Sequence, residues 1–166
     1  MNLAQNLDNC KYCPLDYIEN IFADKFLGCE RRSNHELVLE VNGKWNNILL
    51  FLAWEESMNC LHLSCLLPVE NNSEDKSKIF ELLALVNADL WVGHFSYWSE
   101  HKMPIFKHSV LINDFDMSLE KKVSQLMDIA VKECERLYPV FNVVLNKGMN
   151  PQDALYPFNM QTIGQA

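Results

Sequence analysis

The chain has 166 residues, 49% of them hydrophobic, and a formal net charge of −8. This apolar content is enough for one globular domain, which we expect at residues 14–166 behind a loose N-terminal arm at residues 1–13. Nucleic acids and anionic membrane surfaces attract positively charged proteins, so the charge argues against both as partners. The sequence has no run of about 20 apolar residues and no signal-peptide pattern, so we expect a cytoplasmic protein.

The N-terminal part of the domain predicts a helix followed by strands. Pro14 is a favoured first helical residue, and apolar side chains recur at helical spacing as far as Phe26. Gly28 is typical of the end of such a helix, and Cys29 is a possible strand start. Apolar residues then occupy every second position in residues 37–41, which is typical of a half-buried strand.

Turn signals delimit the next two strands. Asn42 and Gly43 form a strong hairpin turn, and residues 48–54 follow as a strand. Unlike its neighbours, this strand is apolar at nearly every position, so both of its faces carry large apolar side chains. A polar turn at residues 55–59 leads to a third strand at residues 61–67.

The central part predicts a second helix and a hairpin. A polar loop at residues 71–75 precedes a helical stripe at residues 79–90. Strands at residues 94–100 and 105–112 come next. Between the helix and the first of these strands, large aromatic residues flank a glycine hinge, and we expect Trp91 and Phe95 to be core residues.

A long helix is expected to begin after Ser118, with an apolar stripe that continues to Phe141. Pro139 lies inside it. Because proline lacks a backbone donor and clashes one turn back, we expect a kink or a break there, with the following apolar segment packed on the sheet or on a second subunit. Gly148 closes the helix, and residues 150–153 start a short terminal helix.

The element order is therefore helix, three strands, helix, two strands, long helix. Hairpins set beside helices, without alternation of single strands and helices, favour an α+β fold in which an antiparallel sheet packs with helices.

Cysteine usage fits a reducing compartment. Cys29, Cys60, Cys65 and Cys134 occur singly within apolar patterns, as small buried hydrophobes do. Cys10 and Cys13 are the one pair at metal-ligand spacing. The sequence has no second cysteine pair and no close histidine pair to complete a zinc site, so we expect neither a metal nor another cofactor.

No recognisable catalytic motif is present. Cys60 and His62 share one strand face, but strand neighbours two apart rarely align as a nucleophile and its base. The acidic pairs Glu55/Glu56 and Glu133/Glu135 lie where solvated charge is ordinary. With only five glycines, the chain also lacks a glycine-rich phosphate loop.

Several motifs resemble the YbjN-like family of bacterial sensory-transduction regulators. The resemblance extends from about Pro14 onward, and its motifs lie at residues 30–33, 43–45, 54–56, 61–65, 83–87, 90–95, 104–108, 133–139 and 162–166. It implies a type III secretion chaperone-like fold, a homodimer and binding of extended segments of other proteins. It implies no catalytic residues.

Two functional hypotheses follow. The first is a non-enzymatic regulator or chaperone-like protein that binds an unidentified protein partner. The second is a thiol-dependent enzyme or redox protein that uses Cys10/Cys13 or Cys60/His62.

For the first hypothesis, the candidate interface comprises Leu49, Phe51 and Ala53, which share one side of the non-alternating strand, together with Trp45. An apolar surface of this size is rarely left to solvent, although burial on both faces within one subunit is the alternative.

Overall fold

A computed structural model describes residues 13–22, 28–69, 76–112 and 118–163, with side chains as far as residue 157. Cys10 and most of the expected N-terminal arm lie outside these residues, as do Phe26 and the polar loop at residues 71–75. In chain order, the elements are α1 (Pro14–Phe22), β1 (Gly28–Ser33), β2 (Glu36–Val41), β3 (Ile48–Glu55), β4 (Cys60–Leu66), α2 (Ser77–Ala88), β5 (His94–Trp98), β6 (Met103–Leu111), α3 (Leu119–Lys147) and α4 (Pro151–Ile163).

The strands form one antiparallel sheet in the order β1-β2-β3-β4-β6-β5. The expected α+β class is confirmed, but four strands precede α2 where the sequence predicted three. The additional strand, β1, begins at Gly28, so this glycine starts a strand. Because β1 is a mostly polar edge strand, it has no alternating apolar pattern that would mark it in the sequence.

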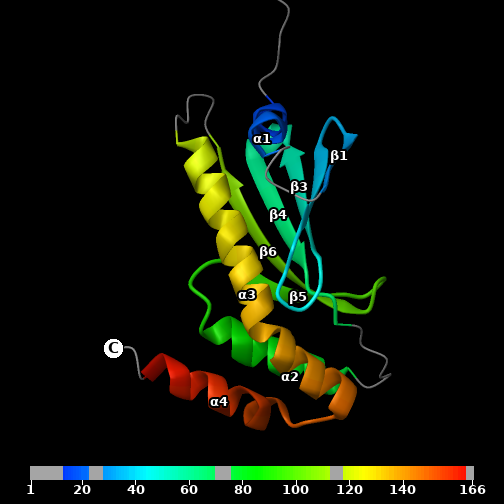
Figure 1. Cartoon of the computed structure of the whole chain (residues 1–166), viewed down its shortest axis with the longest axis vertical. Coiled ribbons are helices and arrows are strands. Elements are labelled where there is room, and N and C mark those ends of the chain that lie inside the picture. Colours follow the sequence, from blue (N-terminus) through cyan, green and yellow to red (C-terminus); the bar gives the residue numbers. More distant parts are fainter. Residues whose placement is uncertain (1–12, 23–27, 70–75, 113–117, 164–166) are drawn as a thin grey trace, which may run out of the picture.

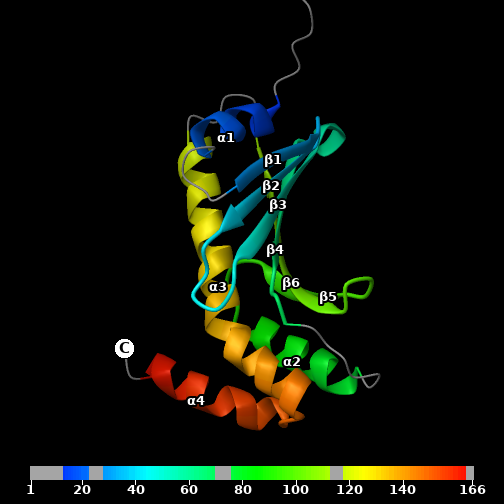
Figure 2. The same ribbon diagram turned by 45° about the vertical axis from the view of Figure 1, so that its right-hand side comes forward.

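Helices cover only one face of the sheet. Figures 1 and 2 show α1 and α3 lying against the same side, with α2, α4 and the second half of α3 below the sheet. The side chains that face α1 and α3 are buried, and from β2, β3 and β4 they include Leu37, Leu39, Leu50, Leu52, Leu61 and Leu63. We call the opposite side the open face.

The helix α3 runs through Pro139 without ending, and its axis changes direction in its second half (Figures 1 and 2), so the structure shows the expected kink and not a break. The segment beyond the proline packs inward, as expected. Phe141 is fully buried, and its ring centroid lies 5.5 Å from that of Phe95 in β5.

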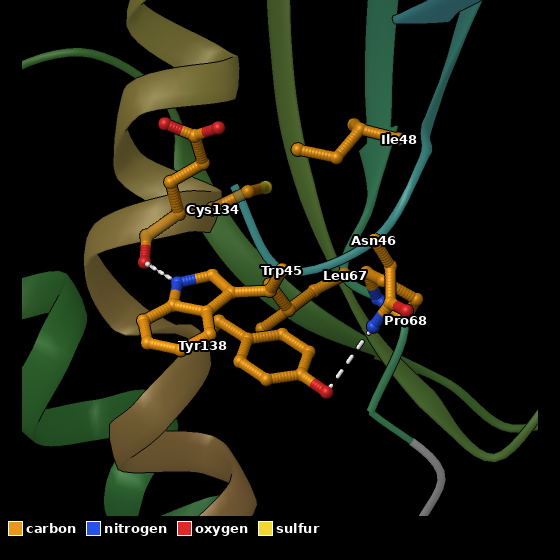
Figure 3. A pocket seen from close by; sticks show the side chains of 8 residues that line it. Trp45, Asn46, Ile48, Leu67, Pro68, Cys134 and Tyr138 are labelled. Atoms are coloured by element: carbon orange, nitrogen blue, oxygen red, sulfur yellow. Dashed lines mark hydrogen bonds between the residues drawn. The ribbon is translucent and has the colours of Figure 1, made fainter. Parts of the chain in front are cut away.

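A side chain from the β2–β3 loop replaces the hydrogen bond that Pro139 removes. In an α-helix, the N–H of residue 139 would bond the carbonyl of Glu135, four residues earlier. Here the indole Nε1–H of Trp45 donates to that carbonyl at 3.0 Å (Figure 3). The Trp45 ring also stacks on Tyr138, with centroids 5.6 Å apart. A hydrogen bond from a residue outside α3 thus supports the continuity of this helix.

The expectation that Trp91 belongs to the core is wrong, whereas Phe95 is buried. Trp91 is 100% exposed and Phe95 is 2% exposed. The reason lies in the bend before β5, because α2 ends at Ala88 and its apolar stripe does not extend to Trp91. Gly93 has a φ of +73°, and a Cβ there would lie 2.2 Å from the Phe106 ring. Only glycine therefore fits this bend.

Replacing Trp45 with Phe keeps an aromatic ring beside Tyr138 but removes the donor to the Glu135 carbonyl. We expect a loss of about 1 kcal/mol in the free energy of unfolding, measured by urea denaturation. In a Pro139→Ala background the backbone N–H returns, so the same change should cost clearly less. Equal costs in both backgrounds would show that the indole does not replace the missing bond.

Replacing Phe95 with Ala should cost about 3–5 kcal/mol, because the ring packs between Phe106 and Phe141. Trp91→Ala should change the free energy of unfolding by less than about 0.5 kcal/mol. Thermal unfolding followed by circular dichroism compares the two variants. A large loss for Trp91→Ala would contradict the exposed position.

Candidate functional site

Three of the four residues of the expected interface lie on the open face. Leu49, Phe51 and Ala53 alternate with the buried residues of β3, and each is half-buried. Phe51 pairs with Val38 of β2 on one side and with Ser64 of β4 on the other. Since directly paired residues point to the same face, the apolar row of β3 lies in the middle of the open face.

An aromatic contact links β3 to β5 on the open face. Trp98 belongs to β5, the third strand from β3 in the sheet order, which would place the two strands about 14 Å apart in a flat sheet. Their rings nevertheless meet edge to face with centroids 6.3 Å apart. The Arg32 guanidinium lies 5.7 Å from the Phe51 ring centroid, and the His101 ring lies 4.1 Å from that of Trp98. We call Arg32, Phe51, Trp98 and His101 the aromatic cluster.

Trp45 is not part of this surface. It lies on α3, where its ring stacks on Tyr138 and its indole N–H bonds the Glu135 carbonyl (Figure 3). Asn46, next in the same loop, donates to the Tyr138 hydroxyl at 3.2 Å. The structure therefore separates Trp45, on the helix side, from the three residues of β3 on the open face.

In the second candidate site, Cys60 with His62, the histidine ring is already hydrogen-bonded to other side chains. Both residues belong to β4 and share the open face, as the sequence predicted. The Nδ1 atom of His62 lies 2.7 Å from the Ser109 hydroxyl, and its Nε2 atom lies 3.1 Å from the Ser64 hydroxyl. With both ring nitrogens hydrogen-bonded to hydroxyls, His62 has no free nitrogen to act as a base toward Cys60.

The pair Cys10 and Cys13 is only partly described, because Cys10 lies outside the described residues. The Cys13 Sγ donates to the Asn34 carbonyl at 3.5 Å, and Arg31 donates to this sulfur at 3.6 Å. These contacts attach the start of α1 to the β1–β2 hairpin. No group of three or more potential metal ligands occurs among the described residues.

The carboxylates in the two acidic pairs also have structural partners. Arg136 donates to Glu133 at 2.6 Å, and the backbone N–H of Lys44 donates to the Glu135 carboxylate at 2.7 Å. Hydrogen bonds from Ser57 lower the pKa of Glu55, which opposes a role as a general acid.

Two hollows lie outside the open face. One is an open hollow beside α3, lined by Phe22, Leu50 and Met127, among others. The other is an open hollow around Arg31, whose guanidinium is paired with Asp16 at 2.9 Å and Glu19 at 3.3 Å. These ion pairs join α1 to β1, so this hollow has a structural explanation.

Sequence reasoning did not identify Arg32, Trp98 and His101 as neighbours of Phe51. Local patterns place each residue on a strand or turn, but they do not reveal that β6 lies between β4 and β5. The lack of alternation in β3, which is apolar at nearly every position, was the one local signal for the open face. The partners of Phe51 depend on strand order.

Comparison with solved structures defines the class of the fold. The structure is similar to a chain in the "Crystal Structure of the ExsC-ExsE Complex", with a TM-score of 0.54 and 14% sequence identity. The match covers 75% of this chain and 91% of the other. The chain belongs to the YbjN family, described as "Putative bacterial sensory transduction regulator", which matches residues 14–142.

No curated protein matches the chain. Among the described residues, no helix has the length and apolar character needed to cross a membrane.

Histidine protonation should destabilise the fold. Burial is the main reason why the pKa values of His62 and His108 are lowered, so the neutral forms are favoured in the folded state. The unfolded chain titrates near the usual value of about 6.5. Stability should therefore be full above this pH and should fall as the pH drops through the lowered values.

Urea denaturation at several pH values measures this dependence. His62→Gln should make the decline less steep, whereas His35→Gln, at an exposed position, should leave it unchanged. A decline that is identical in all three proteins would exclude His62 as its source.

Proposed function

We propose that this chain is a non-enzymatic, cytoplasmic regulator or chaperone-like protein that acts by binding proteins through its open face, and that it forms a homodimer. The observation that carries the proposal is the apolar row of Leu49, Phe51 and Ala53. No described helix covers this row, whereas α1 and α3 cover the opposite face. Apolar surface rimmed by polar residues is typical of protein interaction sites.

The family and the fold support this proposal at the level of class. The YbjN family is described in terms of signal transduction and not of a reaction. The similar solved structure is a complex of two proteins, which agrees with a binding role. At 14% identity that likeness concerns the fold alone, so the proposal transfers no partner from it.

The alternative, a thiol-dependent enzyme, has less support. Both nitrogens of His62 are bonded to serine hydroxyls. Buried Cys134 lies 3.4 Å from Cys65, and burial raises its pKa, which makes its thiol a poor nucleophile. Rapid alkylation of one cysteine at neutral pH would favour the enzyme. Uniformly slow alkylation fits structural thiols.

Sedimentation velocity tests the interface. If the open face is an interface between two copies, the wild type should be a dimer, and Phe51→Asp should give folded monomers, because a carboxylate on β3 would lose its hydration on association. Trp91→Asp is the control, since it adds the same charge at an exposed site far from β3 in sequence. The Trp91→Asp variant should therefore remain a dimer.

Two results would count against this interface. A wild type that remains monomeric at all concentrations would refute the homodimer. Unfolding of Phe51→Asp, seen by circular dichroism, would show that Phe51 contributes mainly to the core.

A further inference from the structure

The strands on one side of Phe51 lack acidic residues altogether. Although the chain contains 22 aspartates and glutamates, none occurs in Cys60–Leu66, His94–Trp98 or Met103–Leu111. These strands, β4, β5 and β6, are neighbours in the sheet. In this acidic protein, the strands that form one half of the open face therefore carry no carboxylate side chain.

The register places His62, His94 and Lys107 of these strands on the open face, whereas His108 pairs with Leu63 and points to the helix side. Ser64 pairs with Lys107, and Lys107 pairs with His94, so the three lie in one row with Phe51. The adjacent row contains His62 and Ser109. We call His62, His94, Lys107 and Ser109 the basic row.

Lys107 has no counter-ion in the described part of the chain. It is half-buried and takes part in no ion pair or hydrogen bond among the described residues. After burial, the charges of Lys107 and His94 are the next causes that lower the pKa of His62. Among the described residues, no carboxylate therefore pairs with the charge of Lys107.

The other half of the open face has the opposite character. Glu36 and Glu40 pair with Ala53 and Leu49, so they point to the same side as the apolar row of β3. Across the face, acidic residues on β2 give way to the apolar row of β3 and then to the basic row on β4, β6 and β5. This polarity favours a ligand with an anionic group at one end and an apolar group beside it.

We propose that the open face binds an extended segment of a partner protein, with a carboxylate side chain at Lys107 and His94 and an apolar side chain against Phe51 and Trp98. This inference rests on the proposed function and specifies the chemistry of its partner. A carboxylate would supply the missing counter-ion of Lys107 and accept hydrogen bonds from Lys107 and Ser109. The charge of Lys107 beside the apolar row favours a segment that carries both an acidic and an apolar side chain.

Fluorescence anisotropy with two labelled peptides tests the proposal. The first peptide alternates Val and Phe with Glu, and the second carries Gln in place of every Glu. The wild type should bind the Glu peptide at least about tenfold more tightly, as expected when a charge-assisted hydrogen bond forms. Lys107→Gln should abolish this preference. Lys121→Gln, the same charge change at an exposed position in α3, should preserve it.

Equal affinity of the wild type for the two peptides would overturn the proposal. The absence of binding at about 1 mM peptide would also overturn it, because at this concentration only very weak complexes escape detection. An unchanged preference in Lys107→Gln, with a normal circular dichroism spectrum, would also overturn it. A wild-type dimer that Lys107→Gln dissociates, without any peptide preference, would make a second copy the occupant. That result would refute the proposed acidic segment as the ligand, but it would support the proposed function, which is protein binding through the open face.

Discussion

The hydrogen bond from the Trp45 indole to the Glu135 carbonyl supports the continuity of α3, on which the rest of the structure depends. The first half of α3 buries residues such as Ala130 and Cys134 on the helix side of the sheet. The second half carries Phe141 and Val144 into the region below the sheet, where α2 and α4 pack. A break at Pro139 would uncouple these two parts. The indole replaces a donor that the helix backbone lacks.

One continuous helix on one side leaves the other side of the sheet without a helical cover. An antiparallel sheet with one solvated face normally places polar residues there. β3 departs from this rule at Leu49, Phe51 and Ala53, and the Trp98 ring and the Arg32 guanidinium lie beside the Phe51 ring. The basic row lies on the same face. The face thus combines apolar contact area with the charge of Lys107, which no described carboxylate pairs, and this combination suits recognition of another molecule.

The sequence predicted what local periodicity determines. It predicted the fold class, the outward row of β3, the helices α2 and α4, and the inward packing of Phe141. It gave Cys29 as a possible strand start but left β1 out of the predicted order, because the edge position removes alternation. It placed Trp91 in the core because large aromatic residues flank the Gly93 hinge. The donor that replaces the missing hydrogen bond of α3 at Pro139 comes from Trp45, which is remote in sequence. The neighbours of Phe51 depend on strand order, which no local pattern encodes.

The central claim is that the open face contacts another protein. Site-specific photocrosslinking tests it most directly, with a photoreactive phenylalanine analogue at Leu49 on the open face, or at fully exposed Trp91 as the control. Irradiation in living cells should give a discrete, larger protein adduct from position 49 and none from position 91, whether the captured protein is a second copy or a different partner. Equal crosslinking from both positions, or none from position 49, would contradict the claim.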